Sequence, residues 1–139
     1  MNKVFGISLV VLALALAVVP AFTDCQSQGK AITLANGKTV PMKCHWTGVA
    51  ELGTAIPLAG VGAMMVANRR KSNMMTMGVL GIVLGGVAVA YPNGLIGVCQ
   101  TQMLCNTVMK PTLTALGSLT ALGGIGAVIL SRRTSDVPA

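Results

Sequence analysis

Four apolar stretches, each about as long as a membrane-spanning helix, dominate this chain of 139 residues. They cover residues 4–22, 47–67, 74–91 and 111–130. A helix needs roughly 20 apolar residues to cross the hydrocarbon core of a bilayer. A transmembrane barrel needs shorter segments of alternating polarity, which these continuous runs do not provide. The pattern therefore predicts an all-α membrane protein, a four-transmembrane-helix bundle that forms a single membrane domain over residues 1–139.

The composition excludes the main alternatives to a membrane protein. Of all residues 53% are hydrophobic and only 9% are charged, which is too few for the surface of a soluble domain. The net charge of +7 does not indicate nucleic-acid binding, because the basic residues flank apolar stretches and have almost no aromatic side chains between them. We therefore expect the lipid bilayer, and no nucleic acid, as a partner.

Lysine and arginine predict how the chain is oriented in the membrane. An excess of Lys and Arg marks the cytoplasmic ends of membrane helices. All the arginines lie in the short link 68–73 or after the fourth stretch, at Arg132 and Arg133. We expect a protein of the cytoplasmic (inner) membrane with both termini and this link in the cytoplasm, and extracytoplasmic loops at about 23–46 and 92–110. Four lysines on the outer side weaken the contrast: Lys30, Lys38, Lys43 and Lys110.

The first stretch also resembles a secretory signal peptide, because Lys3 precedes it and small residues follow at Pro20 and Ala21. Its apolar run, Val4–Val19, is longer than the usual core of a signal, and Thr23–Asp24 matches a cleavage site poorly. We favour a retained helix. A cleaved signal would leave three spans.

All four cysteines, Cys25, Cys44, Cys99 and Cys105, fall in the two predicted outer loops. Thiols oxidise outside the cytoplasm, so an even number of cysteines there predicts a disulfide framework. Four cysteines allow three connectivities, and the sequence alone leaves them open. We favour Cys25 with Cys44 and Cys99 with Cys105, which would stiffen each loop, over pairing between the loops.

The first outer loop contains a hairpin signal. Residues 31–40 alternate in polarity around Asn36-Gly37, a pair that supplies the two positive-φ residues of a type I′ turn. This predicts a small β-hairpin between Cys25 and Cys44. An isolated two-stranded hairpin is marginally stable in water, so a disulfide between its flanks would hold this cap.

The same loops allow two chemical interpretations. Thiol–disulfide redox proteins use Cys-x-x-Cys pairs, whereas five residues separate Cys99 from Cys105 here. The second interpretation is copper handling, because soft thiolate and thioether ligands suit Cu(I). The candidate ligands for it are Met42, Cys44, His45, Met103 and Cys105. No repeated ligand spacing supports a site, so we predict no metal or other cofactor and keep both interpretations as alternatives.

The junction between the first outer loop and the second stretch holds three candidate functional residues, His45, Trp46 and Glu51. Trp46 is the only tryptophan and lies where an interfacial aromatic residue is expected. Thr47 is expected to cap the helix, which puts Glu51 at the end of the first turn, where the helix dipole favours an anion. We interpret Glu51 as a carboxylate at the interface. A proton or ligand site, with Lys43 or His45 as partner, is the alternative.

Glycines are frequent in the third and fourth stretches and include the pattern Gly81-x-x-x-Gly85. Small faces let helix backbones approach closely, which is a main source of stability in lipid. We expect these faces to pack the bundle and, where surplus, to bind a membrane-protein partner or a second copy of the chain.

Four segments carry a resemblance to a known family: Met42-Lys-Cys-His-Trp-Thr47, Ala50-Glu-Leu-Gly53, Ile96-Gly-Val-Cys99 and Met103-Leu-Cys105. They resemble the small bacterial membrane proteins grouped as domain-of-unknown-function family 4418, over most of the chain. The resemblance implies four spans and the cysteine pattern, and it points to transporter permeases as partners. It assigns no residue a role.

No catalytic constellation is visible in a chain with three acidic residues and one histidine. We therefore predict an accessory or structural subunit of a membrane complex, such as a transporter, rather than an enzyme. The alternative is an extracytoplasmic thiol–disulfide redox or copper-handling membrane protein.

Overall fold

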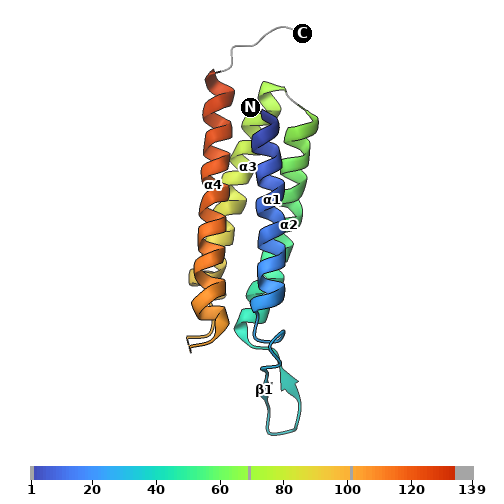
Figure 1. Ribbon diagram of the computed structural model, residues 1–139, viewed down its shortest axis with the longest axis vertical. Coiled ribbons are helices and arrows are strands. Elements are labelled where there is room, and N and C mark those ends of the chain that lie inside the picture. Colours follow the sequence, from blue (N-terminus) through green and yellow to red (C-terminus); the bar gives the residue numbers. More distant parts are fainter. Residues whose placement is uncertain (1, 69, 101, 134–139) are drawn as a thin grey trace.

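Four long helices run alternately up and down and form an elongated bundle (Figure 1). The structure, a computed structural model, describes residues 2–68, 70–100 and 102–133. The helices are α1 (Asn2–Thr23), α2 (Lys43–Ala67), α3 (Lys71–Ala90) and α4 (Lys110–Arg133), with π-helical segments η1 (Tyr91–Leu95) after α3 and η2 (Cys105–Met109) before α4. Each of the four helices is long and apolar enough to cross a membrane. The prediction of an all-α protein with four apolar helices is confirmed.

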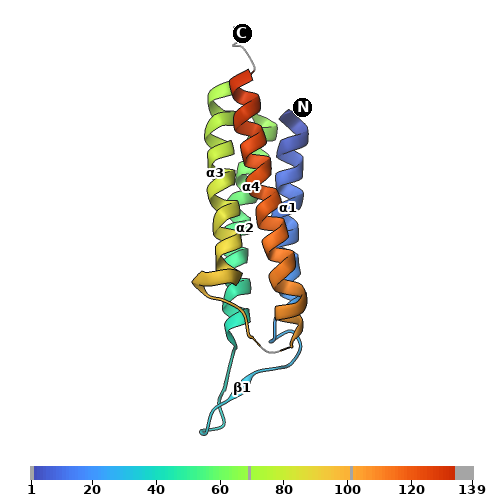
Figure 2. The ribbon, with the colours of Figure 1, turned by 90° about the vertical axis from the view of Figure 1, so that its left-hand side faces the viewer.

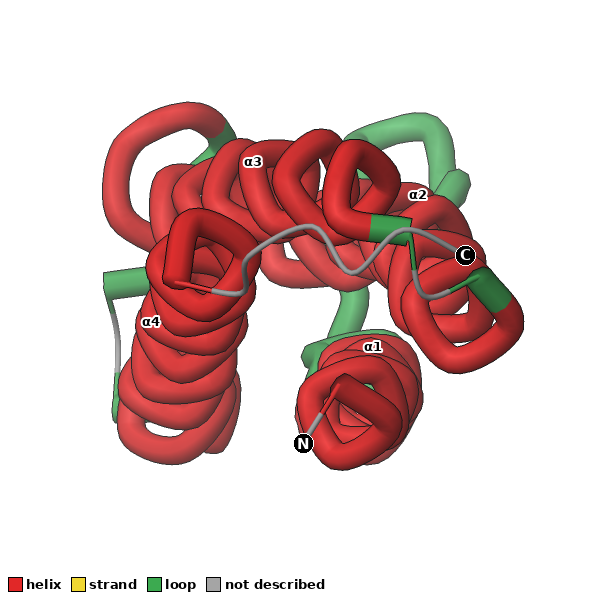
Figure 3. The backbone as a smooth tube through the Cα atoms, turned by 90° about the horizontal axis from the view of Figure 1, so that it is seen from above, coloured by secondary structure: helices red, strands yellow, loops and turns green. Residues whose placement is uncertain are grey.

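The bundle consists of two closely packed helical hairpins, α1 with α2 and α3 with α4, and the contacts between the hairpins are less extensive. Seen from above, the helices follow one another around the bundle in chain order (Figure 3). The loops of both hairpins lie at the same end of the bundle, away from the end where α1 begins and α4 ends (Figure 2). We call this the loop end, and all four cysteines lie there.

Glycine contacts explain why the two hairpins are so tight. A Cβ atom built on Gly85 would lie 2.6 Å from the backbone nitrogen of Ala121 and 2.8 Å from the carbonyl oxygen of Gly117. In the other hairpin, a Cβ atom on Gly6 would lie 2.9 Å from the carbonyl oxygen of Gly62. Any side chain at these positions would push the backbones apart, so glycine brings α3 onto α4 and α1 onto α2.

The predicted hairpin in the first loop is present, but its turn differs from the expected one. Strands β1 (Ile32–Thr33) and β2 (Thr39–Val40) pair antiparallel, with Ile32 opposite Val40. Gly37 has a positive φ of 78°. Asn36 has a negative φ, because only glycines have positive φ among the described residues. A type I′ turn is therefore wrong. The loop instead carries one left-handed glycine, Gly37, whose N–H donates a hydrogen bond to the carbonyl oxygen of Leu34, as is typical of hairpin loops longer than two residues.

Helix α2 begins earlier than expected, and this changes the position of Glu51. The helix starts at Lys43 with Met42 as its N-cap, so the predicted N-cap role of Thr47 is wrong. The Thr47 hydroxyl instead donates a hydrogen bond to the carbonyl oxygen of Gly97, 2.7 Å away. Glu51 thus lies in the third turn of α2 and is buried in the bundle.

Candidate functional site

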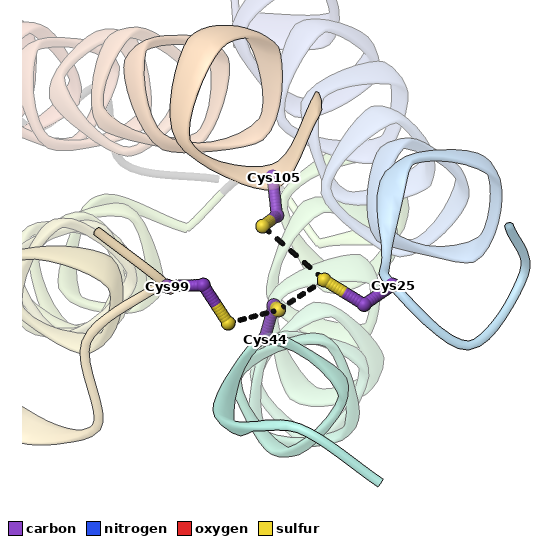
Figure 4. A group of neighbouring side chains, drawn as sticks. All are labelled: Cys25, Cys44, Cys99 and Cys105. Atoms are coloured by element: carbon purple, nitrogen blue, oxygen red, sulfur yellow. Dashed lines mark hydrogen bonds between the residues drawn. The ribbon is translucent and has the colours of Figure 1, made fainter. Parts of the chain in front are cut away.

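Four cysteines from four separate segments meet at the loop end of the bundle (Figure 4). Cys25 follows α1, Cys44 lies in the first turn of α2, Cys99 lies in the loop after η1, and Cys105 begins η2. Their Sγ atoms all lie within 4.8 Å of one another. We call this group the four-cysteine cluster.

The four cysteines are free thiols whose sulfur atoms lie very close together. The Sγ atom of Cys44 lies 2.7 Å from that of Cys25 and 3.1 Å from that of Cys99, and the Sγ atoms of Cys25 and Cys105 are 3.3 Å apart. A disulfide bond would bring two sulfur atoms to about 2.05 Å. No described cysteine is disulfide-bonded. The predicted disulfide framework and its connectivity therefore stay predictions.

Burial separates the four thiols into two kinds. Cys25, Cys44 and Cys105 are buried, whereas Cys99 is partly exposed. Burial raises the pKa of the Cys25 thiol, and its hydrogen bonds with Cys44 and Cys105 raise it further. Cys25 therefore holds its proton at neutral pH, and Cys99 is the member that solvent or an incoming ion can reach.

Two methionines extend the cluster with thioether sulfurs. The Sδ atom of Met103 lies 3.9 Å from the Cys25 Sγ, and that of Met42 lies 4.0 Å from the Cys99 Sγ. Each methionine thus crosses to a cysteine of the other hairpin. The sequence shows the same Met-x-Cys pattern where the second helix of each hairpin begins, in Met42-Lys-Cys44 at the start of α2 and in Met103-Leu-Cys105 before α4. This repeat is the sequence signal that could have linked the two loops.

The candidate copper ligands named from the sequence are only partly brought together. Met42, Cys44, Met103 and Cys105 all belong to the cluster or touch it. His45 does not, because its Nδ1 donates a hydrogen bond to Oδ2 of Asp24 at 3.0 Å. Sequence reasoning placed Cys25 and Cys99 only in a disulfide framework and did not connect Asp24 with His45.

The Asp24–His45 pair braces the backbone on both sides of the cluster. Asp24 precedes Cys25, and His45 follows Cys44. Burial of the Asp24 carboxylate favours its neutral form, but hydrogen bonds from His45 and Ser27 outweigh this and hold the pKa of Asp24 below its usual value. The pair is therefore a polar clamp that fixes the spacing of two cluster cysteines.

Trp46 lies on the outside of this clamp. Its ring contacts the ring of His45 edge to face, with centroids 5.9 Å apart, and 55% of the residue is exposed. Trp46 therefore points away from the cluster, in keeping with an interfacial position.

Glu51 is fully buried below the cluster. Neither carboxyl oxygen has a hydrogen-bond partner among the described residues. The predicted partners do not reach it: His45 binds Asp24, and Lys43 is exposed. The expected position of Glu51 at the end of the first helical turn is wrong, because helix α2 starts at Lys43 and the carboxyl is buried inside the bundle.

These features define a multi-pass membrane protein with a cluster of cysteine and methionine sulfurs at one end of a four-helix bundle. The chain belongs to the family described as a domain of unknown function, DUF4418, whose model matches residues 4–130. This confirms the family resemblance seen in the sequence motifs. Comparisons with curated proteins and with solved structures give no match.

Proposed function

We propose that this protein binds a soft metal ion, Cu(I), in the four-cysteine cluster at the extracytoplasmic end of the bundle. The observation that carries the proposal is the approach of four Sγ atoms from four segments to within 4.8 Å of one another. A tetrahedral tetrathiolate site of the kind that zinc forms, with metal–sulfur bonds near 2.3 Å, has sulfur–sulfur edges of about 3.8 Å. Small outward movements of the sulfurs would accommodate an ion.

The ligand set favours Cu(I) over harder metals. Thiolates and thioethers are soft ligands, and the cluster carries Met42 and Met103 at its edge, with no carboxylate or imidazole among its contacts in residues 2–68, 70–100 and 102–133. The partly exposed Cys99 is the entry point, and the buried thiols Cys25, Cys44 and Cys105 would hold the ion away from solvent.

Metal binding at this site would release protons. The Cys25 thiol has a raised pKa, so each new metal–sulfur bond at a protonated thiol forms as the S–H bond breaks and the proton leaves to water. The Cu(I) affinity is therefore expected to rise with pH.

Copper stoichiometry tests the proposal. The protein, purified under reducing conditions in detergent, is titrated with Cu(I) against a chromophoric chelator such as bicinchoninate. We expect one tightly bound ion per chain, a sharp loss of affinity in Cys44→Ser, and no change in the control Met64→Leu, whose methionine is exposed on α2. Unchanged affinity in Cys44→Ser would contradict the site. If the protein bound zinc but not Cu(I), the proposal of a metal site in the cluster would stand and the assignment of copper would be wrong.

The predicted disulfide framework is the competing state of the same four residues. Oxidation of the cluster to two disulfides removes every thiolate ligand, so metal and disulfide exclude each other. Thiol labelling in native membranes before and after reduction distinguishes the two states. Cysteines that react only after strong reduction would support a structural framework and exclude a resident metal ion.

We also keep the proposal of an accessory subunit in a membrane complex, and one face of α2 supports it. Gly53, Ile56 and Gly60 follow one another on an exposed side of the helix, and the space beside both glycines is open. A partner helix could approach closely there. We expect partner co-purification to be lost in the double variant Gly53→Leu/Gly60→Leu and retained in Gly86→Leu, an exposed glycine of α3 with equally open space.

We further propose that the protein lies in the bacterial inner membrane with both termini in the cytoplasm. Arg70 and the pair Arg132–Arg133 lie at the end opposite the cluster, which supports a cytoplasmic position for that end. Arg69, which belongs to the same predicted cytoplasmic link, lies outside the described residues. A C-terminal reporter fusion tests the orientation: green fluorescent protein should fluoresce there and alkaline phosphatase should be inactive.

A further inference from the structure

Glu51 is a buried acid without a partner. Its exposed fraction is 0%, and neither carboxyl oxygen accepts or donates a hydrogen bond among the described residues. An isolated carboxylate in an apolar interior loses its hydration without compensation, whereas a protonated carboxyl is neutral and loses far less. The surroundings of Glu51 therefore decide which form is stable.

The nearest polar side chains on the same face of α2 are already engaged. Thr47 and Thr54 lie one turn on either side of Glu51 and are buried. The Thr47 hydroxyl donates to the carbonyl oxygen of Gly97, and the Thr54 hydroxyl donates to that of Ala50. Neither has a hydrogen left for Glu51.

No described cation reaches the carboxyl either. No salt bridge or hydrogen bond to Glu51 exists in the part of the chain that the structure describes, and its single imidazole, that of His45, is bound to Asp24. With neither a counter-ion nor a donor, a proton is the ligand that makes Glu51 compatible with this environment.

We propose that Glu51 is a proton-binding site inside the membrane-embedded bundle. Glu51 lies seven residues from Cys44 on the same buried face of α2, or about 10 Å along the helix axis. Ionisable residues inside membrane helices are typical of proton pathways. The inference depends only on Glu51 and its neighbours, so it stands whether or not the cluster binds a metal.

Dicyclohexylcarbodiimide, an apolar reagent that modifies protonated carboxyls in membrane interiors, tests the protonation directly. We expect one label per chain on the peptide that contains Glu51, and complete loss of that label in Glu51→Gln. Asp24 is a built-in control, because it is held ionised by His45 and Ser27 and should remain unlabelled in the same sample. An unlabelled Glu51 in the wild-type protein would overturn the proposal. Protection of Glu51 by sodium ions would also overturn it and would indicate a cation site.

A second measurement needs no variant. Glu51 is the only glutamate in the chain, so incorporation of ¹³C-glutamate shifts the infrared carboxyl bands of this residue alone among the acids. We expect an isotope-shifted C=O stretch of a protonated carboxyl at neutral pH in the wild-type protein. An isotope shift confined to the carboxylate bands would show an ionised Glu51 and reject the proposal.

Discussion

Nδ1 of His45 lies 3.0 Å from Oδ2 of Asp24, so a single hydrogen bond joins the residue after Cys44 to the residue before Cys25. The two cysteines that it spaces have their Sγ atoms 2.7 Å apart. The clamp thus connects a partly buried polar pair with the geometry of the sulfur cluster beside it.

The clamp predicts a dependence of stability on pH. The pKa of Asp24 is lower in the folded protein than its ordinary value, so its ionised form stabilises the fold. This contribution is complete above the ordinary pKa of about 4 and is lost as the pH falls through the lower, folded value. Thermal unfolding in detergent between neutral and strongly acid pH measures it. Asp24→Asn should flatten the acid limb of the profile, and an unchanged acid limb would contradict the assignment.

The glycine contact between α3 and α4 predicts opposite effects at two adjacent positions. Gly85→Ala places a methyl group against the backbone of α4, and we expect a loss of about 1–3 kcal/mol in the free energy of unfolding from overpacking. Gly86→Ala is the matched control, because its Cβ would enter open space. The control should be neutral or more stable by up to about 1 kcal/mol, since alanine is the better helix former. Equal effects at both positions would contradict the helix packing.

The distances within the cluster predict an order of oxidation. Cys25 and Cys44 have the closest sulfur atoms, at 2.7 Å, and we expect mild oxidation to join them first. Cys99 and Cys105, within 4.8 Å of each other, would form the second disulfide. Peptide mass analysis without reduction measures the order and the connectivity. A first disulfide between Cys44 and Cys99, or between Cys25 and Cys105, would show that pairing crosses between the hairpins.

Replacing the carboxyl group of Glu51 by an apolar side chain is expected to stabilise the folded protein. A buried polar group without partners costs roughly 1–3 kcal/mol, so Glu51→Met, which is apolar and similar in length, should raise the free energy of unfolding by about that amount. Glu51→Gln, which keeps a polar group that needs partners, is the comparison variant and should gain less. Chemical unfolding in detergent measures both. A less stable Glu51→Met would show that the carboxyl makes an interaction essential to the fold.

Trp46 predicts where the loop end meets the membrane. It is the only tryptophan and is half exposed, so the intrinsic indole fluorescence reports on this site alone. In vesicles, lipids brominated near the headgroup should quench it more strongly than lipids brominated near the end of the acyl chain. Stronger quenching by the deeper bromines would place Trp46 within the hydrocarbon core instead.

Features that depend on local sequence were predictable. Four apolar runs of spanning length specify four helices, because a backbone in lipid must satisfy its hydrogen bonds within each segment. Asn36-Gly37 between alternating residues specifies a hairpin. The type of turn was not predictable from this pair, because only Gly37 of the two has a positive φ and the turn type depends on the loop length. The boundaries were not predictable: the start of α2 at Lys43 moved Glu51 from the first turn of the helix to the third, where it is buried.

The sequence by itself thus determined the helices, the hairpin and the family, all of which follow from residue order over short distances. Tertiary structure alone decided that Cys25, Cys44, Cys99 and Cys105 form one cluster, that His45 binds Asp24, and that Glu51 is buried with no hydrogen-bond partner among the described residues. The physical reason is that these contacts depend on how each helix is rotated and how closely glycines let the backbones approach. Neither quantity is encoded in the spacing of residues along one segment.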